Sequence, residues 1–212
     1  RATPRRISCM LTVAGRRSRY RYMREFHSLR QKLAKIKVLA LDCDGVLTPP
    51  YIDTGVVMTK EAARQHTERD FMYVLESARF SHRDGQGIDL VRKESVEVLI
   101  LTTQRSGYVQ ARAWKLGVPL VHNKDKVAGL KKWMKENHPN MNFKVVCFVG
   151  DSIGDVDIMR IVGVPACVAD GAREAKKAAT YITKQKGGDG AVREICDLIV
   201  RAKTGTIKKT RK

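Results

Sequence analysis

The stretch Val38-Leu39-Ala40-Leu41-Asp42-Cys43-Asp44-Gly45-Val46-Leu47-Thr48 decides the fold class that the sequence predicts. Its first four residues form an unbroken apolar run of strand length, which is typical of a parallel strand buried on both faces. Two aspartates follow at once, and a glycine then permits a tight turn. Apolar runs at 98–101 and 145–149 also end in polar residues. The pattern predicts an α/β protein with polar side chains at the carboxyl ends of its strands.

Strand and helix patterns alternate from residue 37 onward, as expected for a doubly wound α/β sheet. We expect strands near 37–42, 97–103, 119–121, 144–149, 165–168 and 181–183. Helices are expected near 85–94, 106–117, 125–138, 153–162, 172–179 and 189–202. Residues 22–36 carry apolar side chains at three- and four-residue steps, which predicts an amphipathic basic helix. That helix either docks on the domain or binds RNA or another partner through its basic face.

Positive charge is concentrated at the two ends of the chain. The 212 residues have a formal net charge of +19. Residues 1–37 hold twelve Lys and Arg against one acidic residue, and residues 201–212 hold six against none. Residues 38–200 are nearly neutral, with 23 basic and 21 acidic side chains. We therefore expect a basic N-terminal arm and amphipathic helix over 1–36, a folded domain over 37–200 and a basic tail over 201–212.

The basic arms are consistent with salt-sensitive binding to RNA phosphates. The first residues are rich in Arg and poor in acids, which resembles a mitochondrial targeting segment; a solvated tail without an address is the alternative. We expect a mitochondrial matrix protein, or otherwise a cytoplasmic one, tethered to an RNA-rich assembly such as the mitochondrial ribosome or its precursor. The expected RNA contacts are Arg5, Arg6, Arg16, Arg17, Arg19, Arg21, Lys208, Lys209, Arg211 and Lys212.

Cysteine usage and hydropathy exclude several classes of protein. The five cysteines are scattered and form no CxxC pair, so we expect neither a disulfide framework nor a zinc cluster, and the compartment is predicted to be reducing. No apolar stretch approaches the roughly eighteen residues that a membrane span needs. We therefore expect no membrane partner.

Four signals occur in a fixed order: Asp42 with Asp44, then Thr103, then Lys126, then Gly150-Asp151-Ser152-Ile153-Gly154-Asp155. Because the carboxyl ends of parallel strands open onto one crevice, these residues should converge. Asp42 is expected to attack a phosphoryl group and Asp44 to act as acid and base. Mg²⁺ on Asp42, Asp151 and the backbone carbonyl of residue 44 would supply positive charge. Lys126 and Thr103 would contact the phosphate.

The order and the motifs resemble the haloacid dehalogenase superfamily of phosphohydrolases. Three stretches carry a narrower resemblance to the branch of 3-deoxy-D-manno-octulosonate 8-phosphate phosphatase and the C-terminal domain of CMP-sialic acid synthetase. They are Arg83-Asp84-Gly85-Gln86-Gly87-Ile88, residues 164–170 and residues 187–194. The resemblance covers about residues 36–200. It implies a Rossmann-like sheet, a minimal cap with a β-hairpin flap, and a homotetramer whose subunits complete each other's sites.

The resemblance also implies roles for single residues. It makes Asp42 the nucleophile, Asp44 the acid and base, and Asp42, Asp44 and Asp151 the metal ligands. It assigns phosphate contacts to Thr103 and Lys126. Asp155 would either contact the metal ligands without binding the metal itself, or anchor Lys126. Arg83 and Asp84 would line the substrate site or fix the turn before the helix near 85–94.

The periphery departs from that branch at several positions. Pro49-Pro50 stands where the branch has Asp-Gly, Gln104 replaces a glycine, Ala172-Arg173 replaces His-Pro, and a polar extension lies between Val57 and Ala78. The sugar-acid specificity of the branch is therefore not carried over. His66, His82, His122 and His138 show no metal-ligand spacing, and His82 is expected nearest to the site.

We predict a Mg²⁺-dependent phosphatase domain, acting on a phosphorylated small molecule, that is attached by basic arms to an RNA-rich complex. Two alternatives stay open. The first is a non-catalytic structural or assembly factor of a ribonucleoprotein with the same fold. The second is a free metabolic sugar-acid phosphatase.

Overall fold

A six-stranded sheet forms the centre of the molecule in the computed structural model, which describes residues 26–58 and 71–205. All neighbouring strands are parallel, and their order is β5-β4-β1-β6-β7-β8. The predicted α/β fold with a parallel sheet is confirmed. The strands are β1 (Val38–Leu41), β4 (Glu97–Thr102), β5 (Leu120–His122), β6 (Val146–Gly150), β7 (Val164–Cys167) and β8 (Tyr181–Ile182).

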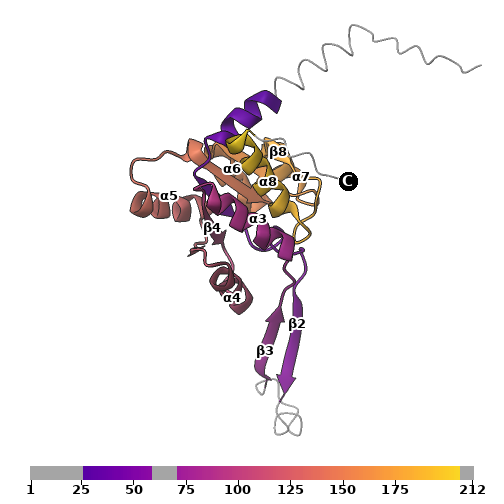
Figure 1. The fold of residues 1–212 in the computed structure, drawn as a ribbon. Helices are drawn as coiled ribbons and strands as arrows, with labels where there is room; N and C mark the ends of the chain where they lie inside the picture. Colours follow the sequence, from indigo (N-terminus) through magenta and orange to yellow (C-terminus); the bar gives the residue numbers. More distant parts are fainter. Residues whose placement is uncertain (1–25, 59–70, 206–212) are drawn as a thin grey trace, which may run out of the picture.

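Helices cover both faces of this sheet (Figure 1). One face packs against a helix over residues 26–34, α3 (His82–Lys93), α4 (Gly107–Leu116) and α8 (Ala191–Thr204). The other face packs against α5 (Lys126–Asn137), α6 (Val156–Ile161) and α7 (Arg173–Ala178). Short 3-10 helices, η1 (Phe143–Val145) and η2 (Ile153–Asp155), flank β6. Trp133 of α5 is buried in the core, as the helical spacing predicts.

The apolar runs are continuous because side chains on both faces of each strand are buried. Leu39 and Leu41 of β1 point into one core cluster, whereas Val38 and Ala40 point into the other. Successive side chains of a strand alternate between faces, so a strand covered by helices on both sides needs apolar residues at every position. The polar residues that follow β1, β4 and β6 therefore lie at one edge of the sheet.

A β-hairpin projects from the body of the molecule between β1 and α3 (Figure 1). Its strands, β2 (Asp53–Met58) and β3 (Phe71–Ser77), pair antiparallel with a register shift between Val57 and Met58. This hairpin matches the flap that the resemblance implies. Most of the polar extension expected in it falls on residues 59–70, outside the described residues.

The helix over residues 26–34 docks on the domain through two leucines. Leu29 and Leu33 are buried in the same core cluster as Ile199 of α8, whereas Phe26 is exposed. A small groove of about 230 Å³ remains between this helix and α8. The sequence left two interpretations of this segment, docking on the domain or binding a partner. Its apolar face docks on the domain.

The predicted RNA-contacting residues all fall on residues 1–25 and 206–212, outside the described part of the chain. The predicted domain boundaries at 36 and 200 therefore stay predictions. Within the described residues, no helix combines the length and the hydropathy needed to cross a membrane.

Replacing Leu33 by alanine should lower the free energy of unfolding by about 2–5 kcal/mol, because the side chain leaves a cavity in the main core. Denaturant unfolding followed by circular dichroism measures this change. Leu75→Ala is the matched control, since Leu75 is exposed on the hairpin and its loss should change stability by less than about 0.5 kcal/mol. Equal stability of Leu33→Ala and the unaltered chain would show that the helix is not part of the folded domain.

Candidate active site

The loop after β1 carries both predicted catalytic aspartates and is held by backbone hydrogen bonds. The Asp42 N–H donates to the carbonyl of Val149 in β6 at 3.0 Å, and the Leu47 N–H donates to the carbonyl of Cys43 at 2.8 Å. Gly45 has a φ of +79°, a left-handed conformation that favours glycine. The turn thereby bends the chain back over the edge of the sheet.

The motif at residues 187–190 packs against this loop and forms a hydrogen bond with it. The Gly188 N–H donates to the carbonyl of Val46 at 2.9 Å, and the Gly187 N–H donates to Oδ1 of Asp170 at 2.9 Å. A Cβ at Gly187 would lie 1.8 Å from the carbonyl oxygen of Gly45, so no other residue fits without displacing the loop. This close approach gives the glycine pair a role in placing the catalytic aspartates.

Lys126, at the start of α5, joins two carboxylates. Its Nζ lies 2.6 Å from Oδ2 of Asp42 and 2.5 Å from Oδ1 of Asp155. All three side chains are buried, with relative exposures of 7%, 6% and 0% for Lys126, Asp42 and Asp155. The second oxygen of Asp42 accepts the Cys43 N–H at 2.8 Å. Asp42 is thus fixed in one orientation by both of its oxygens.

The electrostatics of this cluster are set by burial. Burial raises the pKa of Asp42 to about 7, because Lys126 offsets the cost of a buried carboxylate only in part and Asp155 adds to it. Burial alone would lower the pKa of Lys126, but the two carboxylates beside it raise the pKa above its usual value. Lys126 therefore stays a cation, and further positive charge would favour the ionised form of Asp42.

Three carboxylates can hold a metal ion at this edge of the sheet. One oxygen from each of Asp42, Asp151 and Asp155 lies within 4.8 Å of the others. Asp155 already contacts Lys126 through Oδ1, while its Oδ2 accepts the backbone N–H groups of Asp151 and Ser152 at 2.9 and 3.0 Å. Through these contacts Asp155 joins Lys126 to the loop that presents Asp151, while the choice between its two predicted roles stays a prediction.

Asp151 faces the loop after β1. A Cβ at Gly45 would lie 2.3 Å from Oδ2 of Asp151, so this carboxylate is packed directly against the turn that follows the two predicted catalytic aspartates. Burial, together with the neighbouring Asp155, raises the pKa of Asp151 to about 6. Carboxylate oxygens are the ligands that Mg²⁺ prefers, and two carboxyl groups with raised pKa values gain most from a bound cation. The site therefore fits the predicted Mg²⁺.

Asp44 contacts a residue that the sequence analysis did not single out. The hydroxyl of Tyr108, in the first turn of α4, donates to Oδ1 of Asp44 at 2.8 Å. Oδ2 of Asp44 is buried and has no hydrogen-bond partner among the described residues. From its position in this helix, Tyr108 resembles an ordinary packing residue. The sequence therefore gives no signal that it contacts Asp44.

A cavity of about 360 Å³ lies over these residues. Asp42, Asp44, Lys126 and Asp151 line it together with Thr103, so the structure brings together five of the predicted site residues. Thr103 is exposed. The preceding Thr102, the last residue of β4, is buried, and its Oγ1 accepts the Gln104 N–H at 3.0 Å. The strand was predicted to end at residue 103, whereas β4 ends at Thr102. Thr102 was therefore placed inside the strand and was not predicted as a second candidate for phosphate contact.

A second, polar cavity of about 810 Å³ adjoins the first and shares Thr103, Gln104 and Lys124 with it. Arg105 and His122 complete part of its wall. Arg105 Nε donates to Nδ1 of His122 at 3.2 Å, and Nε2 of His122 lies 3.0 Å from the carbonyl oxygen of Thr103. Since a carbonyl oxygen only accepts, Nε2 carries the proton and Nδ1 is free to accept from Arg105. His122, rather than the expected His82, thus lines a cavity at the site.

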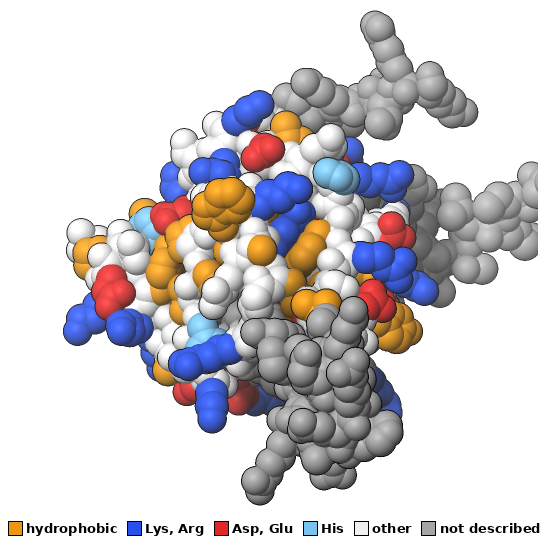
Figure 2. Space-filling model, turned by 90° about the horizontal axis from the view of Figure 1, so that it is seen from below, with side chains coloured by type: hydrophobic (Ala, Val, Ile, Leu, Met, Phe, Trp, Pro, Cys, Tyr) orange, Lys and Arg blue, Asp and Glu red, His pale blue; other side chains and the backbone are white. Residues whose placement is uncertain are grey.

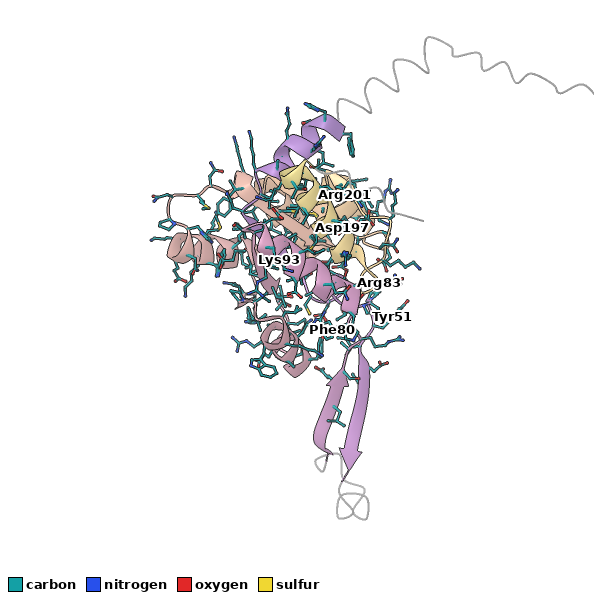
Figure 3. All side chains as sticks on the ribbon, viewed as in Figure 1. Tyr51, Phe80, Arg83, Lys93, Asp197 and Arg201 are labelled. Atoms are coloured by element: carbon teal, nitrogen blue, oxygen red, sulfur yellow. The ribbon has the colours of Figure 1, made fainter. Side chains whose placement is uncertain are left out.

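Arg83 and Asp84 lie in the first turn of α3, at the junction with the hairpin (Figure 3). Asp84 is fully buried, and its Oδ1 accepts the Arg193 N–H of α8 at 2.8 Å. Neither residue is among those lining the two cavities. Asp84 ties α3 to the beginning of α8 through this contact. The two predicted roles of the pair, lining the substrate site or fixing the turn before the helix, stay predictions.

The face from which the hairpin projects carries Lys and Arg side chains with hydrophobic ones between them (Figure 2). Acidic side chains are fewer and scattered in this view. A ligand approaching from this side meets mostly positive charge, which suits an anion.

Comparisons with known proteins give one consistent family. A family model described as haloacid dehalogenase-like hydrolase matches residues 118–195. The 3-deoxy-D-manno-octulosonate 8-phosphate phosphatase KdsC of Yersinia pestis is 31% identical over 176 residues, which cover 81% of this chain and 83% of that protein. The same enzyme of Escherichia coli K12 is 31% identical over 173 residues, covering 81% and 82%.

Solved structures agree in fold. A haloacid dehalogenase superfamily hydrolase of subfamily III A from Legionella pneumophila has a TM-score of 0.75 and 27% identity, and the match covers 87% of this chain and 93% of that one. The 3-deoxy-D-manno-octulosonate 8-phosphate phosphatase of Moraxella catarrhalis, solved with a magnesium ion, a phosphate ion and a KDO molecule, has a TM-score of 0.71 and 27% identity over 84% and 94%. The resemblance inferred from the motifs and the expected magnesium cofactor are confirmed.

Stability of the metal-free protein should fall as pH rises from about 4 to about 7, because a carboxyl group with a raised pKa in the folded state stabilises that state only while it is protonated. Mg²⁺ competes with these protons, so excess Mg²⁺ should raise the melting temperature more at about pH 8 than at about pH 5.5. Thermal unfolding with and without Mg²⁺ at both pH values measures this difference.

Asp42→Asn should weaken this dependence on pH and Mg²⁺, whereas Asp157→Asn should not, since Asp157 pairs with Arg160 on the surface. Stabilisation by Mg²⁺ that is equal at both pH values, or equal in the two variants, would place the metal elsewhere.

Proposed function

The chain belongs to the haloacid dehalogenase-like hydrolases, and on this premise we propose that it hydrolyses the phosphate monoester of a small molecule through a phosphorylated Asp42. The observation that carries the proposal is the buried bridge of Lys126 between Asp42 and Asp155, beside a cavity that Asp44 and Asp151 also line. A nucleophile, a fixed cation and a second carboxyl group are the components that stepwise phosphoryl transfer requires.

In the first step, Oδ2 or Oδ1 of ionised Asp42 attacks phosphorus while the bond between phosphorus and the ester oxygen breaks. Lys126 lies within hydrogen-bond distance of Asp42, so its charge would also stabilise the phosphoryl oxygens that approach this carboxylate. Asp44 would give a proton to the departing ester oxygen, which leaves as an alcohol. Thr103 and the neighbouring Thr102 offer hydroxyl groups at the cavity wall.

In the second step, a water molecule attacks the phosphoryl group on Asp42, and the bond between that group and the carboxylate breaks. Asp44 takes a proton from the water, so it ends in the state from which the first step began. Phosphate leaves and Asp42 returns to a free carboxylate. The same carboxyl group therefore serves as acid in one step and as base in the next.

The acidic cluster would hold Mg²⁺ through Asp42 and Asp151, with Asp44 contributing through its side chain or its backbone carbonyl. Bound Mg²⁺ supplies positive charge that offsets the repulsion between a carboxylate and a phosphate dianion. The raised pKa values of Asp42 and Asp151 support this proposal, because both carboxyl groups lack sufficient positive charge from Lys126 alone.

Asp42→Asn should lower the hydrolysis of p-nitrophenyl phosphate about a thousandfold or more, because an amide cannot form the phosphorylated intermediate. Release of p-nitrophenol in the presence of Mg²⁺ measures the rate. Asp157→Asn, on the exposed surface of α6, is the control for the same chemical change and should keep full activity. Activity of Asp42→Asn close to that of the unaltered chain would refute the proposed nucleophile.

The second cavity supports a substrate that carries another anionic group besides the phosphate. Arg105 and Lys124 line this cavity, and no acidic residue is among its lining residues. The relatives act on an octulosonate phosphate, which by its name is a carboxylate as well as a phosphate ester. We place the carboxylate of such a substrate beside Arg105, whose Nε is held by His122 and whose terminal nitrogens have no hydrogen-bond partner among the described residues.

Removing both cations with Arg105→Ala and Lys124→Ala should raise KM for 3-deoxy-D-manno-octulosonate 8-phosphate about tenfold or more. KM for p-nitrophenyl phosphate, which has no second anionic group, should stay within about twofold. Lys132→Ala provides the control, since this lysine has an exposed side chain on α5 and lines neither cavity. An equal change in KM for both substrates would remove the support for a second anion site.

A second proposed function is attachment to an RNA-rich assembly, with the mitochondrial ribosome or its precursor in the mitochondrial matrix as the candidate. The supporting observation is the charge distribution, since eighteen of the forty-one Lys and Arg residues lie within 1–37 and 201–212. Such arms suit phosphate contacts that do not depend on base sequence. Attachment is compatible with catalysis, and it would also suit a purely structural role of this fold.

Deleting residues 1–21 and 204–212 should weaken binding to a mixed-sequence RNA and reduce the dependence of Kd on salt concentration. With fewer phosphate contacts, binding releases fewer counterions from the RNA. Fluorescence anisotropy over a salt series measures both quantities. The deleted chain should retain its phosphatase activity. Unchanged affinity and salt dependence would refute the attachment, and sedimentation of the endogenous protein apart from ribosomal RNA would refute the named assembly.

A further inference from the structure

The contact between Tyr108 and Asp44 joins a helix to the catalytic loop across 64 residues of sequence. The phenol oxygen lies 2.8 Å from Oδ1 of Asp44, and both side chains are partly buried. Burial, together with the carboxylate beside it, raises the pKa of Tyr108 to about 12. Tyr108 therefore keeps its proton at neutral pH and acts as the donor in this hydrogen bond.

The hydrogen bond makes the two oxygens of Asp44 unequal. Oδ1 accepts from Tyr108, whereas Oδ2 is buried without a hydrogen-bond partner among the described residues, and Asp44 lines the cavity. A carboxyl group that exchanges protons with a substrate needs one oxygen free and a defined orientation. Tyr108 supplies the orientation by holding Oδ1.

Helix α4 is fixed firmly enough to make Tyr108 a rigid support. Val109 and Ala113 bury one side of the helix in the core. Arg112, one turn after Tyr108, is buried, and its Nη2 donates to the carbonyl of Ser81 at 3.1 Å. Its guanidinium also lies 4.8 Å from the centre of the Phe80 ring, at the junction of the hairpin with α3 (Figure 3).

We propose that Tyr108 is a positioning residue for Asp44, whose carboxyl group it holds at the cavity through Oδ1. The inference rests on the proposed function, in which Asp44 is the acid and the base. As the ester bond breaks, the proton on the Asp44 carboxyl group moves to the departing oxygen. As water then attacks phosphorus, one of its protons returns to the Asp44 carboxylate. The hydrogen bond from Tyr108 to Oδ1 persists through both steps and keeps the carboxyl group from turning away.

Tyr108→Phe removes the donor and keeps the ring. We expect kcat/KM for an alkyl phosphate such as the octulosonate 8-phosphate to fall about tenfold, because its leaving group needs the proton. For p-nitrophenyl phosphate, whose leaving group departs without a proton, kcat/KM should change by less than about twofold. Asp44→Asn should show the same selectivity between the two substrates with a larger loss of kcat/KM for the alkyl ester.

Tyr181→Phe is the matched control, because the Tyr181 hydroxyl also donates to a carboxylate, Glu194, at 2.7 Å, but between β8 and α8. It should leave the ratio of the two kcat/KM values unchanged. Equal losses on both substrates in Tyr108→Phe, or no loss on either, would overturn the positioning role. An inactive Asp42→Asn alongside an unchanged ratio in Tyr108→Phe would refute this inference alone, whereas an active Asp42→Asn would refute the proposed function itself.

Discussion

The buried bridge from Asp42 through Lys126 to Asp155 is the interaction on which the site depends. It joins the loop after β1, the first residue of α5 and the loop after β6, which are separated by up to 113 residues of chain. Removing one partner of a buried ion pair typically costs about 3–5 kcal/mol, because the other charge stays buried without compensation. The bridge also leaves the site short of positive charge, since Asp42 keeps a raised pKa beside Lys126. A bound metal ion would correct this imbalance and allow the site to accept an anionic phosphate ester.

The parallel sheet makes that convergence possible, and this part of the structure was predictable from sequence. Apolar runs such as Val38-Leu39-Ala40-Leu41 predict buried parallel strands, because a strand covered on both faces needs apolar side chains at every position. Asp42 and Lys126 follow from their positions after or beside such strands. The bounds of the hairpin could not be predicted, because the residues of β2 and β3 whose burial the structure describes, 53–55 and 75–77, are all exposed and impose no alternation of apolar and polar residues.

The residues that sequence reasoning missed are those whose role comes from a distant contact. Tyr108 has the spacing of a packing residue, and only the fold shows that its hydroxyl meets Asp44. His122 is held at the wall of the second cavity by its contacts with Arg105 and the carbonyl of Thr103. Thr102 and Thr103 are adjacent, so an error of one residue at the strand end decides which of them is buried. Asp84 shows the reverse case, since a polar motif residue that was expected at the site joins two helices instead.

The central claim is that the phosphoryl group passes through Asp42. Acid quenching of the enzyme during turnover of a ³²P-labelled phosphate ester, followed by peptide mapping, tests this most directly. The account predicts label on the peptide that contains Asp42, with the alkaline lability of an acyl phosphate, and no label in Asp42→Asn. Turnover without any labelled peptide, or label on a peptide from another part of the chain, would contradict it.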